Sequence, residues 1–376
     1  MRKIQMVDLK SQYNKIKKEV DNAVLNVIES TQYINGPEVK DFQKELENYM
    51  GVKHVIPCAN GTDALQIAMM ALDLKPGDEV ITSDFTYVAT AEIIALLKLK
   101  PVLVDVNPDT YDINIEAIER SITSKTKAIV PVHLFGLAAN MEAIMDLAKK
   151  YNLHVVEDTA QAIGCEYTFK DGSKQKVGTI GTIGCTSFFP SKNLGCYGDG
   201  GAIFTNNDDL ALKLRQIANH GQSRQYIHDR VGVNSRLDSI QAAILRIKLR
   251  HLDSYNAKRS ETADFYDNAF KNQTKVKIPA RVPYSNHVFH QYTLQLNGVD
   301  RDKMREFLLK KGVPAMIYYP IPLHLQEAYK DPRYKAGDFP VTEKLCDVVI
   351  SLPMQTELDN NQLEYITNTV LTFLNK

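Results

Sequence analysis

Four short runs rich in β-branched residues decide the fold of this chain: Val80-Ile81-Thr82, Val102-Leu103-Val104-Asp105, Ala128-Ile129-Val130-Pro131-Val132 and His154-Val155-Val156-Glu157. Segments in which apolar residues recur at helical spacing lie between them, at 88–98 and 141–151. Alternating short strands and helices predict an α/β fold, with a mainly parallel sheet covered by helices on both faces. Because ligands bind such sheets beyond the carboxyl ends of the strands, a site is expected just after each strand.

The alternation extends toward the N-terminus, where helices are expected at 14–29, 38–50 and 62–72, with a short strand at Val55-Ile56. Toward the C-terminus the pattern is helical from about Asp208 to Asn268, and the segment Leu237–Leu252 is the longest predicted helix. Beyond Pro279 the pattern changes to a strand at 292–296 and a helix at 302–311. We therefore predict a large domain at 1–250, including an N-terminal helical segment, and a smaller C-terminal α+β domain at 251–376.

Composition excludes several classes of protein. The 376 residues contain 45 Lys plus Arg and 45 Asp plus Glu, without a long run of one sign, which argues against a nucleic-acid partner. The most apolar run, 93–97, is far too short to span a membrane, and the N-terminus lacks the apolar core of a signal peptide. Five cysteines form no CxxC pair, and no HExxH metal motif, P-loop or GxGxxG turn occurs. We expect a soluble, reduced, cytoplasmic protein without a metal site.

The stretch Ser187-Phe188-Phe189-Pro190-Ser191-Lys192-Asn193-Leu194-Gly195 places a lysine between turn-forming residues and beside aromatic side chains. A partly desolvated amine loses its proton more readily than an amine in water, as a lysine that reacts with carbonyl groups requires. The alternative is a solvated surface lysine, one among the 45 basic residues of the chain.

Polar side chains also follow other predicted strands. In Cys58-Ala59-Asn60-Gly61-Thr62, Gly61 permits a tight turn, and the helix N-terminus after it can bind an anion, although an ordinary N-cap fits the same residues. The hydroxyl of Ser187, at the end of the strand-like run Cys185-Thr186-Ser187, could contribute to the same phosphate cup.

Two further positions suit an aromatic cofactor. Asp158 ends an apolar strand and lies three residues before Gln161, so a carboxylate and an amide project from the same side if a helical turn begins there. An Asp N-cap with a polar neighbour is the alternative. Tyr87 follows another strand and could stack on a planar ring, although a tyrosine there is more often part of the core. Together with Lys192 and the anion cup, these are the parts that pyridoxal phosphate requires.

The chain resembles the DegT/DnrJ/StrS sugar aminotransferases, a branch of the fold-type-I pyridoxal-phosphate enzymes. The resemblance covers nearly the whole chain and rests on a combination of motifs: Val7-Asp8-Leu9, Gly36-Pro37-Glu38-Val39, Asn60-Gly61-Thr62-Asp63-Ala64, Glu157-Asp158-Thr159-Ala160-Gln161, Ser187-Phe188-Phe189-Pro190-Ser191-Lys192, Gly198-Asp199-Gly200-Gly201, Asn234-Ser235-Arg236-Leu237-Asp238 and Tyr319-Pro320-Ile321-Pro322-Leu323. It implies that a mixed, mainly parallel sheet is flanked by helices and followed by the smaller domain.

The resemblance also implies a role for each candidate residue. Lys192 is expected to bind pyridoxal 5′-phosphate covalently, Asp158 to pair with the pyridine nitrogen, and Gln161 to contact the ring oxygen. Tyr87 is expected to stack on the ring. The remaining expected contacts are to the phosphate group, from Gly61, Thr62, Ser187 and Asn234 of the partner subunit. The resemblance therefore implies a homodimer with shared active sites.

The substrates implied are L-glutamate, as amino donor, and a nucleotide-linked keto-sugar. The segments Cys185–Lys192 and Leu194–Gly201 most resemble enzymes acting on the 3-keto form of UDP-N-acetylglucosamine uronic acid, in O-antigen synthesis. Relatives often carry His at the position of Tyr318, so a dTDP-3-keto-6-deoxyhexose remains an alternative. The candidate sugar-binding residues are Arg236, Tyr318 and Tyr319.

Three other readings stay open at the level of sequence. The Arg- and His-rich segment 220–230 either lies over the site, where it would meet a nucleotide diphosphate or a sugar carboxylate, or forms an ordinary solvated loop. A non-catalytic sugar-nucleotide sensor would bind the same cofactor, but Lys192 together with Asp158 favours catalysis. A sugar dehydratase on this scaffold usually replaces the lysine by histidine, which the presence of Lys192 disfavours.

Overall fold

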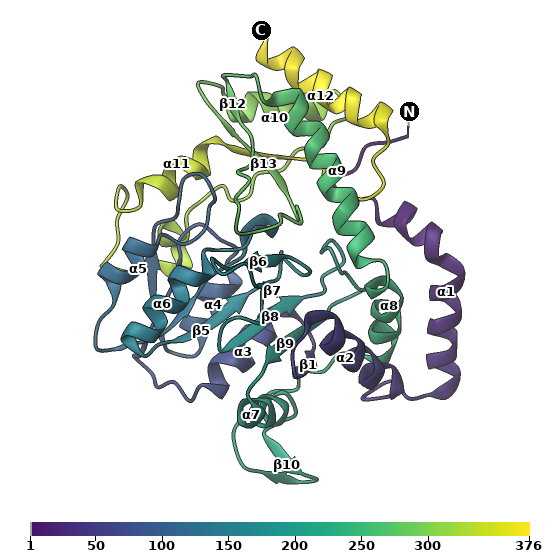
Figure 1. Ribbon diagram of the computed structural model, residues 1–376, viewed down its shortest axis with the longest axis vertical. Coiled ribbons are helices and arrows are strands. Elements are labelled where there is room, and N and C mark those ends of the chain that lie inside the picture. The colour runs from purple at the N-terminus through teal and green to yellow at the C-terminus, as the bar shows by residue number, and fades with distance from the viewer. Residues whose placement is uncertain (1) are drawn as a thin grey trace.

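The computed structural model describes residues 2–376. Within these residues the central sheet has seven strands in the order β1-β9-β8-β5-β4-β2-β3 (Figure 1). Their bounds are β1 His54–Cys58, β2 Glu79–Ser83, β3 Lys100–Val104, β4 Thr126–Val130, β5 His154–Asp158, β8 Ile183–Ser187 and β9 Gly201–Thr205. Strands β3, β2, β4, β5 and β8 are parallel, whereas β9 is antiparallel to both β8 and β1. The prediction of a mainly parallel mixed sheet is confirmed.

Helices cover both faces of this sheet because its strands are apolar on both sides. Val80 and Val130 belong to one core and their neighbours Ile81 and Ile129 to another, as the alternation of side chains along a strand requires. The first face packs against α3 Gly61–Ala71, α4 Ala89–Leu96 and α7 Asp208–Ala218. The second face and the β1 edge pack against α2 Pro37–Met50, α5 Ile115–Ser121, α6 Met141–Tyr151 and α8 Ser239–Leu249.

The C-terminal part forms a separate small antiparallel sheet with its own core (Figure 1). Its strands are β12 Val276–Lys277, β13 Tyr292–Leu296 and β14 Val349–Leu352. The helices around it are α9 Leu252–Phe270, α10 Arg301–Lys310 and α12 Asn360–Leu374, while α11 Pro340–Val348 packs back toward the end of β3. This agrees with the α+β character expected for this part of the chain.

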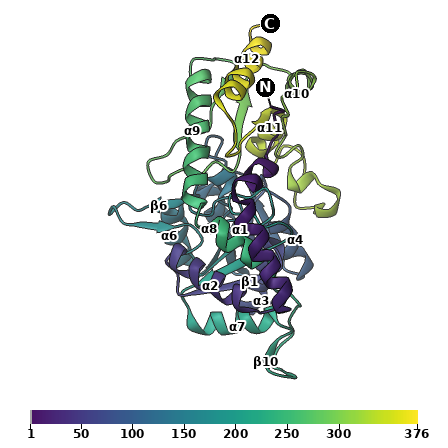
Figure 2. The ribbon, with the colours of Figure 1, turned by 90° about the vertical axis from the view of Figure 1, so that its right-hand side faces the viewer.

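The domain boundary that we propose, between residues 250 and 251, falls between α8 and α9. Helix α9 connects the two parts: Leu252 packs into the core beside β1 and β9, whereas Tyr266 and Phe270 belong to the C-terminal core. The N-terminal residues also cross this boundary, because Ile4 packs in the C-terminal core and only then does α1 Leu9–Ser30 run along α8 (Figure 2).

Two hairpins were not expected from the sequence. The first joins β6 Glu166–Thr168 and β7 Lys174–Lys176. The second, β10 Gln222–Arg224 with β11 Ile227–His228, interrupts the region for which a helical pattern was predicted, so that this prediction was wrong between α7 and α8. In both views β10 projects beyond α7, at the end of the molecule opposite the C-terminal helix (Figures 1 and 2). Among residues 2–376, no helix is both long and apolar enough to cross a membrane.

Candidate active site

The predicted site residues gather where the parallel strands end. Strand β5 ends at Asp158 and β8 ends at Ser187, while α3 begins at Gly61 beside that same edge. Lys192 lies in the loop between β8 and β9, which are antiparallel neighbours in the sheet. The topology therefore brings three motifs, far apart in the sequence, to one edge of the sheet: those of Gly61, of Asp158, and of Ser187 with Lys192.

The loop of Lys192 is held in a compact turn. The backbone N–H of Lys192 donates to the carbonyl of Phe189 at 2.8 Å. A Cβ on Gly195 would lie 2.4 Å from the Pro190 carbonyl oxygen, so only glycine lets the chain close the turn. The next residue, Asn193, is buried and donates through Nδ2 to Asn256 Oδ1 at 2.8 Å and to the Val288 carbonyl at 2.9 Å. Asn193 thus fixes the lysine loop to α9 and to the segment before β13.

The Lys192 amine is electrostatically unusual. Its side chain is half-buried in the chain, and no hydrogen bond from its Nζ to another described residue occurs. Burial lowers the pKa of Lys192 to about 8, and the negative charge of Asp158 opposes this shift. A half-buried amine with a lowered pKa differs from an ordinary solvated lysine, and it loses its proton more readily.

Asp158 is buried and its carboxylate is held by two donors. The Thr90 hydroxyl, from α4, donates to Oδ2 at 2.9 Å, and the backbone N–H of Ala160 donates to Oδ1 at 3.1 Å. The main chain of Asp158 pairs with Pro131 and His133, which follow β4. Among the described residues, no Lys, Arg or His side chain lies within ion-pair distance of this buried carboxylate. A carboxylate of this kind at the end of a strand suits a site that binds a positively charged group.

Gln161 and Tyr319 form one wall beside Asp158. The Gln161 Oε1 accepts from the Phe135 backbone N–H at 2.8 Å, and its Nε2 donates to the Tyr319 hydroxyl at 3.1 Å. The Tyr319 ring lies 5.9 Å from Phe85 and 6.4 Å from Tyr87, centroid to centroid. Tyr87 is 58% exposed, so the alternative of core packing is wrong for this residue. An exposed ring beside two polar side chains is available to a planar ligand.

The N-terminus of α3 fits a phosphate group. Asn60 caps the helix by accepting from the Asp63 N–H, while the N–H groups of Gly61 and Thr62 have no partner inside the helix. A Cβ on Gly61 would lie 2.7 Å from the Ser187 Cβ, and a Cβ on Gly201 would lie 2.4 Å from the Asn60 carbonyl oxygen. The two glycines therefore let the hydroxyl of Ser187 approach the N-terminus of α3. The same residues thus form both an ordinary N-cap, through Asn60, and a cradle that suits an anion.

Asn234 and Arg236 lie in the segment between β11 and α8, and among the described residues no hydrogen bond joins their side chains to Lys192 or Asp158. Asn234 is exposed and forms an isolated bridge with Asn219, and Arg236 donates to Asn219 Oδ1 at 3.3 Å. Between them, Ser235 accepts from the Ala59 N–H at 3.0 Å, which docks the segment beside β1. Tyr318 is half-buried, with its ring 6.0 Å from that of Tyr319. The sugar-binding candidates are thus divided between two regions of the chain.

Comparison with known proteins agrees with this geometry. The model of the DegT/DnrJ/EryC1/StrS aminotransferase family matches residues 14–371. The chain belongs to this family. A curated relative from Pseudomonas aeruginosa, named UDP-2-acetamido-2-deoxy-3-oxo-D-glucuronate aminotransferase, is 47% identical over 96% of this chain and 98% of its own length.

Solved structures of family members extend the match to three dimensions. An aminotransferase from Brucella abortus has a TM-score of 0.94 and 41% identity, over 99% of this chain and 100% of that chain. NtdA from Bacillus subtilis, solved with its cofactor PMP bound, has a TM-score of 0.90 and 31% identity, over 100% of this chain and 86% of that chain. The fold is that of the fold-type-I enzymes, and the chain is an aminotransferase that uses pyridoxal phosphate.

The sequence did not indicate two residues, Thr90 and Asn193, that support the candidate site. Thr90 lies three residues after Tyr87, a helical spacing that offered a weak signal, but its contact with Asp158 joins residues 68 positions apart. Asn193 directly follows Lys192, yet its partners Asn256 and Val288 belong to other elements. Both residues act by holding a neighbour of the cofactor site in place.

Proposed function

We propose that this aminotransferase moves an amino group from L-glutamate to the 3-keto carbon of UDP-2-acetamido-3-keto-glucuronate, in the synthesis of O-antigen or another surface polysaccharide. The observation that carries the chemistry is the convergence of the Lys192 amine, the Asp158 carboxylate and the Gln161 amide at one edge of the sheet. The choice of sugar is supported by 47% identity to the Pseudomonas enzyme over nearly the full length.

In this proposal each residue of the cluster has one task toward the cofactor. Gly61, Thr62 and Ser187 hold the phosphate through backbone N–H groups and hydroxyls, as the cradle at the start of α3 suggests. Asp158 keeps a proton on the pyridine nitrogen and Gln161 donates to the ring oxygen. Tyr87 stacks on one face of the ring, for which its exposed position is suited.

When bound, pyridoxal phosphate supplies an electron sink for the carbanion that remains after a proton leaves the donor's α-carbon. Lys192 moves that proton. Its neutral amine would take the proton from the donor's α-carbon and, as an ammonium group, would deliver it to the C4′ atom of the cofactor. A pKa lowered to about 8 suits both directions, because neutral and charged forms coexist near that pH.

We further propose that the enzyme is a homodimer whose subunits complete each other's sites. Asn234 and Arg236 then serve the partner's cofactor phosphate and sugar, while Tyr318 and Tyr319 serve the sugar within their own chain. Support comes from the exposure of Asn234 and from the projection of the hairpin that contains β10 beyond α7 (Figure 1). In such a dimer, the segment 220–230 lies over the partner's site.

A cytoplasmic location fits this function, and the five buried cysteines are all unpaired, as in a reducing compartment. A second candidate substrate is a dTDP-3-keto-6-deoxyhexose, favoured by Tyr318 at a position where relatives often carry His. The presence of Lys192 together with Asp158 favours catalysis over a sensor without catalytic activity.

The test has two stages. The holoenzyme is mixed with L-glutamate alone, and the visible absorbance of the cofactor is followed; its loss is expected, whereas a pure sensor would leave it unchanged. The aminated enzyme is then offered a panel of UDP- and dTDP-linked keto-sugars, and products are identified by mass. Amination of the UDP-linked 3-keto uronate is expected to have the highest kcat/KM. Preference for a dTDP-linked 6-deoxy sugar would overturn the choice of substrate and leave the chemistry intact.

A further inference from the structure

A buried ionic contact lies behind the wall of Tyr319. Asp84 follows β2 directly and is 1% exposed, and His324, in a short 3-10 turn at Leu323–Leu325, is 2% exposed. The His324 ring Nδ1 lies 2.6 Å from Asp84 Oδ2, and the His324 backbone N–H donates to Oδ1 at 2.8 Å. The N–H of Leu323 donates to the Asp84 carbonyl at 3.3 Å. Residues 240 positions apart in the sequence are thus joined by three polar contacts.

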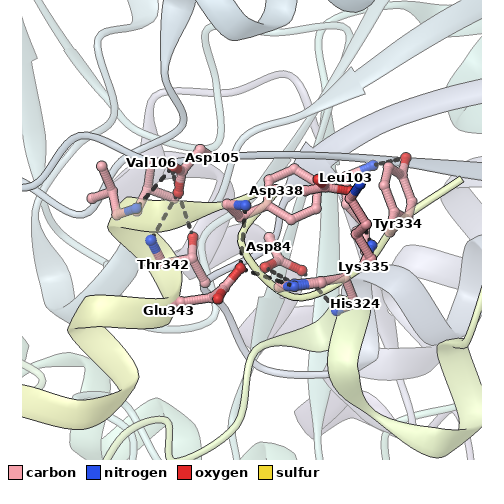
Figure 3. A network of polar contacts seen from close by, with 12 residues as sticks. Asp84, Leu103, Asp105, Val106, His324, Tyr334, Lys335, Asp338, Thr342 and Glu343 are labelled. Carbon is pink, nitrogen blue, oxygen red and sulfur yellow. Dashed lines mark hydrogen bonds and ion pairs between the residues drawn. The ribbon is translucent and has the colours of Figure 1, made fainter.

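A second carboxylate faces the other side of the same ring. His324 Nε2 lies 3.4 Å from Glu343 Oε1, an ion-pair distance without the alignment of a hydrogen bond (Figure 3). Glu343 itself accepts from the Gly337 N–H at 2.7 Å, which fixes the carboxylate in the turn before α11. The Phe339 ring packs edge-on against the His324 ring at 4.7 Å. Asp84 and Glu343 thus place one carboxylate toward each ring nitrogen of His324.

The start of α11 is fixed independently of His324. Asp105, just after β3, accepts from the backbone N–H groups of Val341 at 3.0 Å and Thr342 at 2.8 Å, and from the Thr342 hydroxyl at 2.7 Å (Figure 3).

Burial raises the pKa of Asp84 to about 6, while the positive charge of His324 opposes the rise. Asp84 is therefore a carboxylate that depends on its histidine partner to stay ionised.

The two residues of this contact are close in sequence to Tyr87 and Tyr319. Asp84 lies three residues before Tyr87, and His324 lies five residues after Tyr319. Between them, the Phe85 ring packs against Tyr319 at 5.9 Å. The Asp84–His324 contact and the Phe85–Tyr319 packing thus join the segments 84–87 and 319–324 into a closed ring. The position of Tyr319 opposite Tyr87 therefore depends on the contact of His324 with Asp84. Lys192, Asp158 and the α3 terminus lie on other elements, outside that ring.

We propose that His324 is a positioning residue for the sugar nucleotide: through its contact with Asp84, it holds Tyr318 and Tyr319 in place against Tyr87. This inference rests on the proposed function, because it assigns the Tyr318–Tyr319 wall to the sugar. Without the His324 ring, the buried Asp84 carboxylate keeps the backbone N–H of residue 324 and loses its charged partner, and the segment 318–325 moves outward to let water reach the carboxylate. The sugar loses its wall, while the small amino donor still meets Lys192 and Asp158.

The experiment compares two amino donors on the same holoenzyme. L-Glutamate and UDP-2-acetamido-3-amino-2,3-dideoxy-glucuronate, the product of the proposed reaction, are each mixed with excess enzyme in the stopped flow, and the loss of cofactor absorbance is followed. His324→Leu removes both ring nitrogens at similar volume. His324→Asn retains an amide N–H near the position of Nδ1. Thr342→Val, the matched control, removes a hydroxyl donor to Asp105 from the same network and leaves the Asp84 contact intact.

For His324→Leu, the half-saturating concentration of the amino sugar is expected to rise at least about tenfold, while that of glutamate changes by less than about threefold. His324→Asn and Thr342→Val are expected to stay near wild type for both donors. Equal effects on the two donors, no effect on either, or a Thr342→Val effect as large as that of His324→Leu would overturn the positioning role. Should His324→Leu fail to fold, Asp84→Asn, which removes only the charge, is expected to shift the sugar constant in the same direction, and an unchanged constant would overturn the role.

The same data separate the two proposals. A wild-type holoenzyme that reacts with glutamate and ignores the UDP-linked amino sugar would overturn the proposed substrate, and the positioning role for that sugar with it. A wild type that reacts with both donors, combined with an unchanged donor ratio in His324→Leu, would overturn the positioning role alone.

Discussion

Two lysines of this enzyme, the half-buried Lys192 and the buried Lys248, share a lowered pKa and differ in the contacts of their amines. Burial lowers the pKa of both Lys192 and Lys248 to about 8. Lys248, on α8, is 1% exposed, and its Nζ donates to the carbonyl of Gly195 and lies 5.3 Å from the centre of the Tyr197 ring. Lys192, three residues before Gly195, has the charge of Asp158 facing it and no hydrogen-bond partner for its amine among the described residues.

The comparison shows that a perturbed pKa does not by itself identify a reactive group. Lys248 uses its ammonium or amine to close the turn in which Lys192 sits, so its donor capacity is already committed. Lys192 has an uncommitted amine at the carboxyl edge of a parallel sheet, beside an anion cup. An uncommitted amine and these neighbours make Lys192, rather than Lys248, the lysine that we propose reacts with the cofactor.

The largest expected difference between the two lysines is in turnover. Lys192→Ala is expected to bind cofactor without a covalent bond and to lose at least about 10⁴-fold in kcat, because the proton carrier is gone. Lys248→Met, the matched control, is expected to retain kcat within about tenfold, since it touches no reacting atom. Steady-state transamination with glutamate measures both. Transamination by Lys192→Ala at a tenth of the normal rate would end the assignment.

The next largest effect is expected at the charge that faces Lys192. Asp158→Asn removes the carboxylate and is expected to lower kcat by about 10²- to 10³-fold. Thr90→Val keeps the carboxylate and removes the hydroxyl that orients it through Oδ2, so a loss of only about tenfold is expected. Single-turnover rates with glutamate give the comparison. A near-normal rate for Asp158→Asn would mean that another group holds the pyridine nitrogen.

The pH dependence of the glutamate half-reaction sharpens the contrast further. Lys192 must be neutral to accept a proton, and its pKa of about 8 lies well below the usual 10.5. The single-turnover rate is therefore expected to rise about tenfold between pH 7 and pH 9 and to level off above. Lys248→Met should leave this profile unchanged. A rate that continues to climb beyond pH 10 would show that the reacting lysine is not desolvated.

The smallest predicted effect concerns the pH dependence of the free energy of unfolding, to which we expect Lys248 to contribute. Its folded-state pKa of about 8 lies below the unfolded value of about 10.5, so between these values the unfolded chain binds the extra proton. Holoenzyme stability is thus expected to rise by about 2 kcal/mol from pH 8 to pH 10 on account of this residue. Lys248→Met should lack that increment. Urea unfolding at both pH values tests it, and an equal rise in the variant would refute the contribution of Lys248.

Much of the fold could be predicted because its signals are local. The runs at 80–82 and 154–157 are apolar on both sides, and that pattern is typical of strands covered by helices on both faces. The antiparallel insertion of β9 and the β10–β11 hairpin could not be predicted, because strand pairing depends on partners far along the chain. The helical pattern predicted across 220–230 failed for this reason.

The candidate site divides in the same way. Lys192, Asp158 and Gly61 could be found from short motifs, since each chemical role needs a particular residue at a strand end or helix start. Thr90, Asn193 and His324 could not, because each acts by holding a residue on another element. Only packing reveals such supports. The shared sites of the proposed dimer remain a prediction from the resemblance.

The assignment of Lys192 is tested most directly by locating the cofactor on the chain. Holoenzyme is reduced with borohydride, which makes the bond between lysine and cofactor permanent, then digested and analysed by mass spectrometry. The cofactor mass is predicted on the peptide that contains Lys192, with the Lys248 peptide unmodified. Cofactor on Lys248, or on neither peptide in an active preparation, would contradict the account of how this enzyme works.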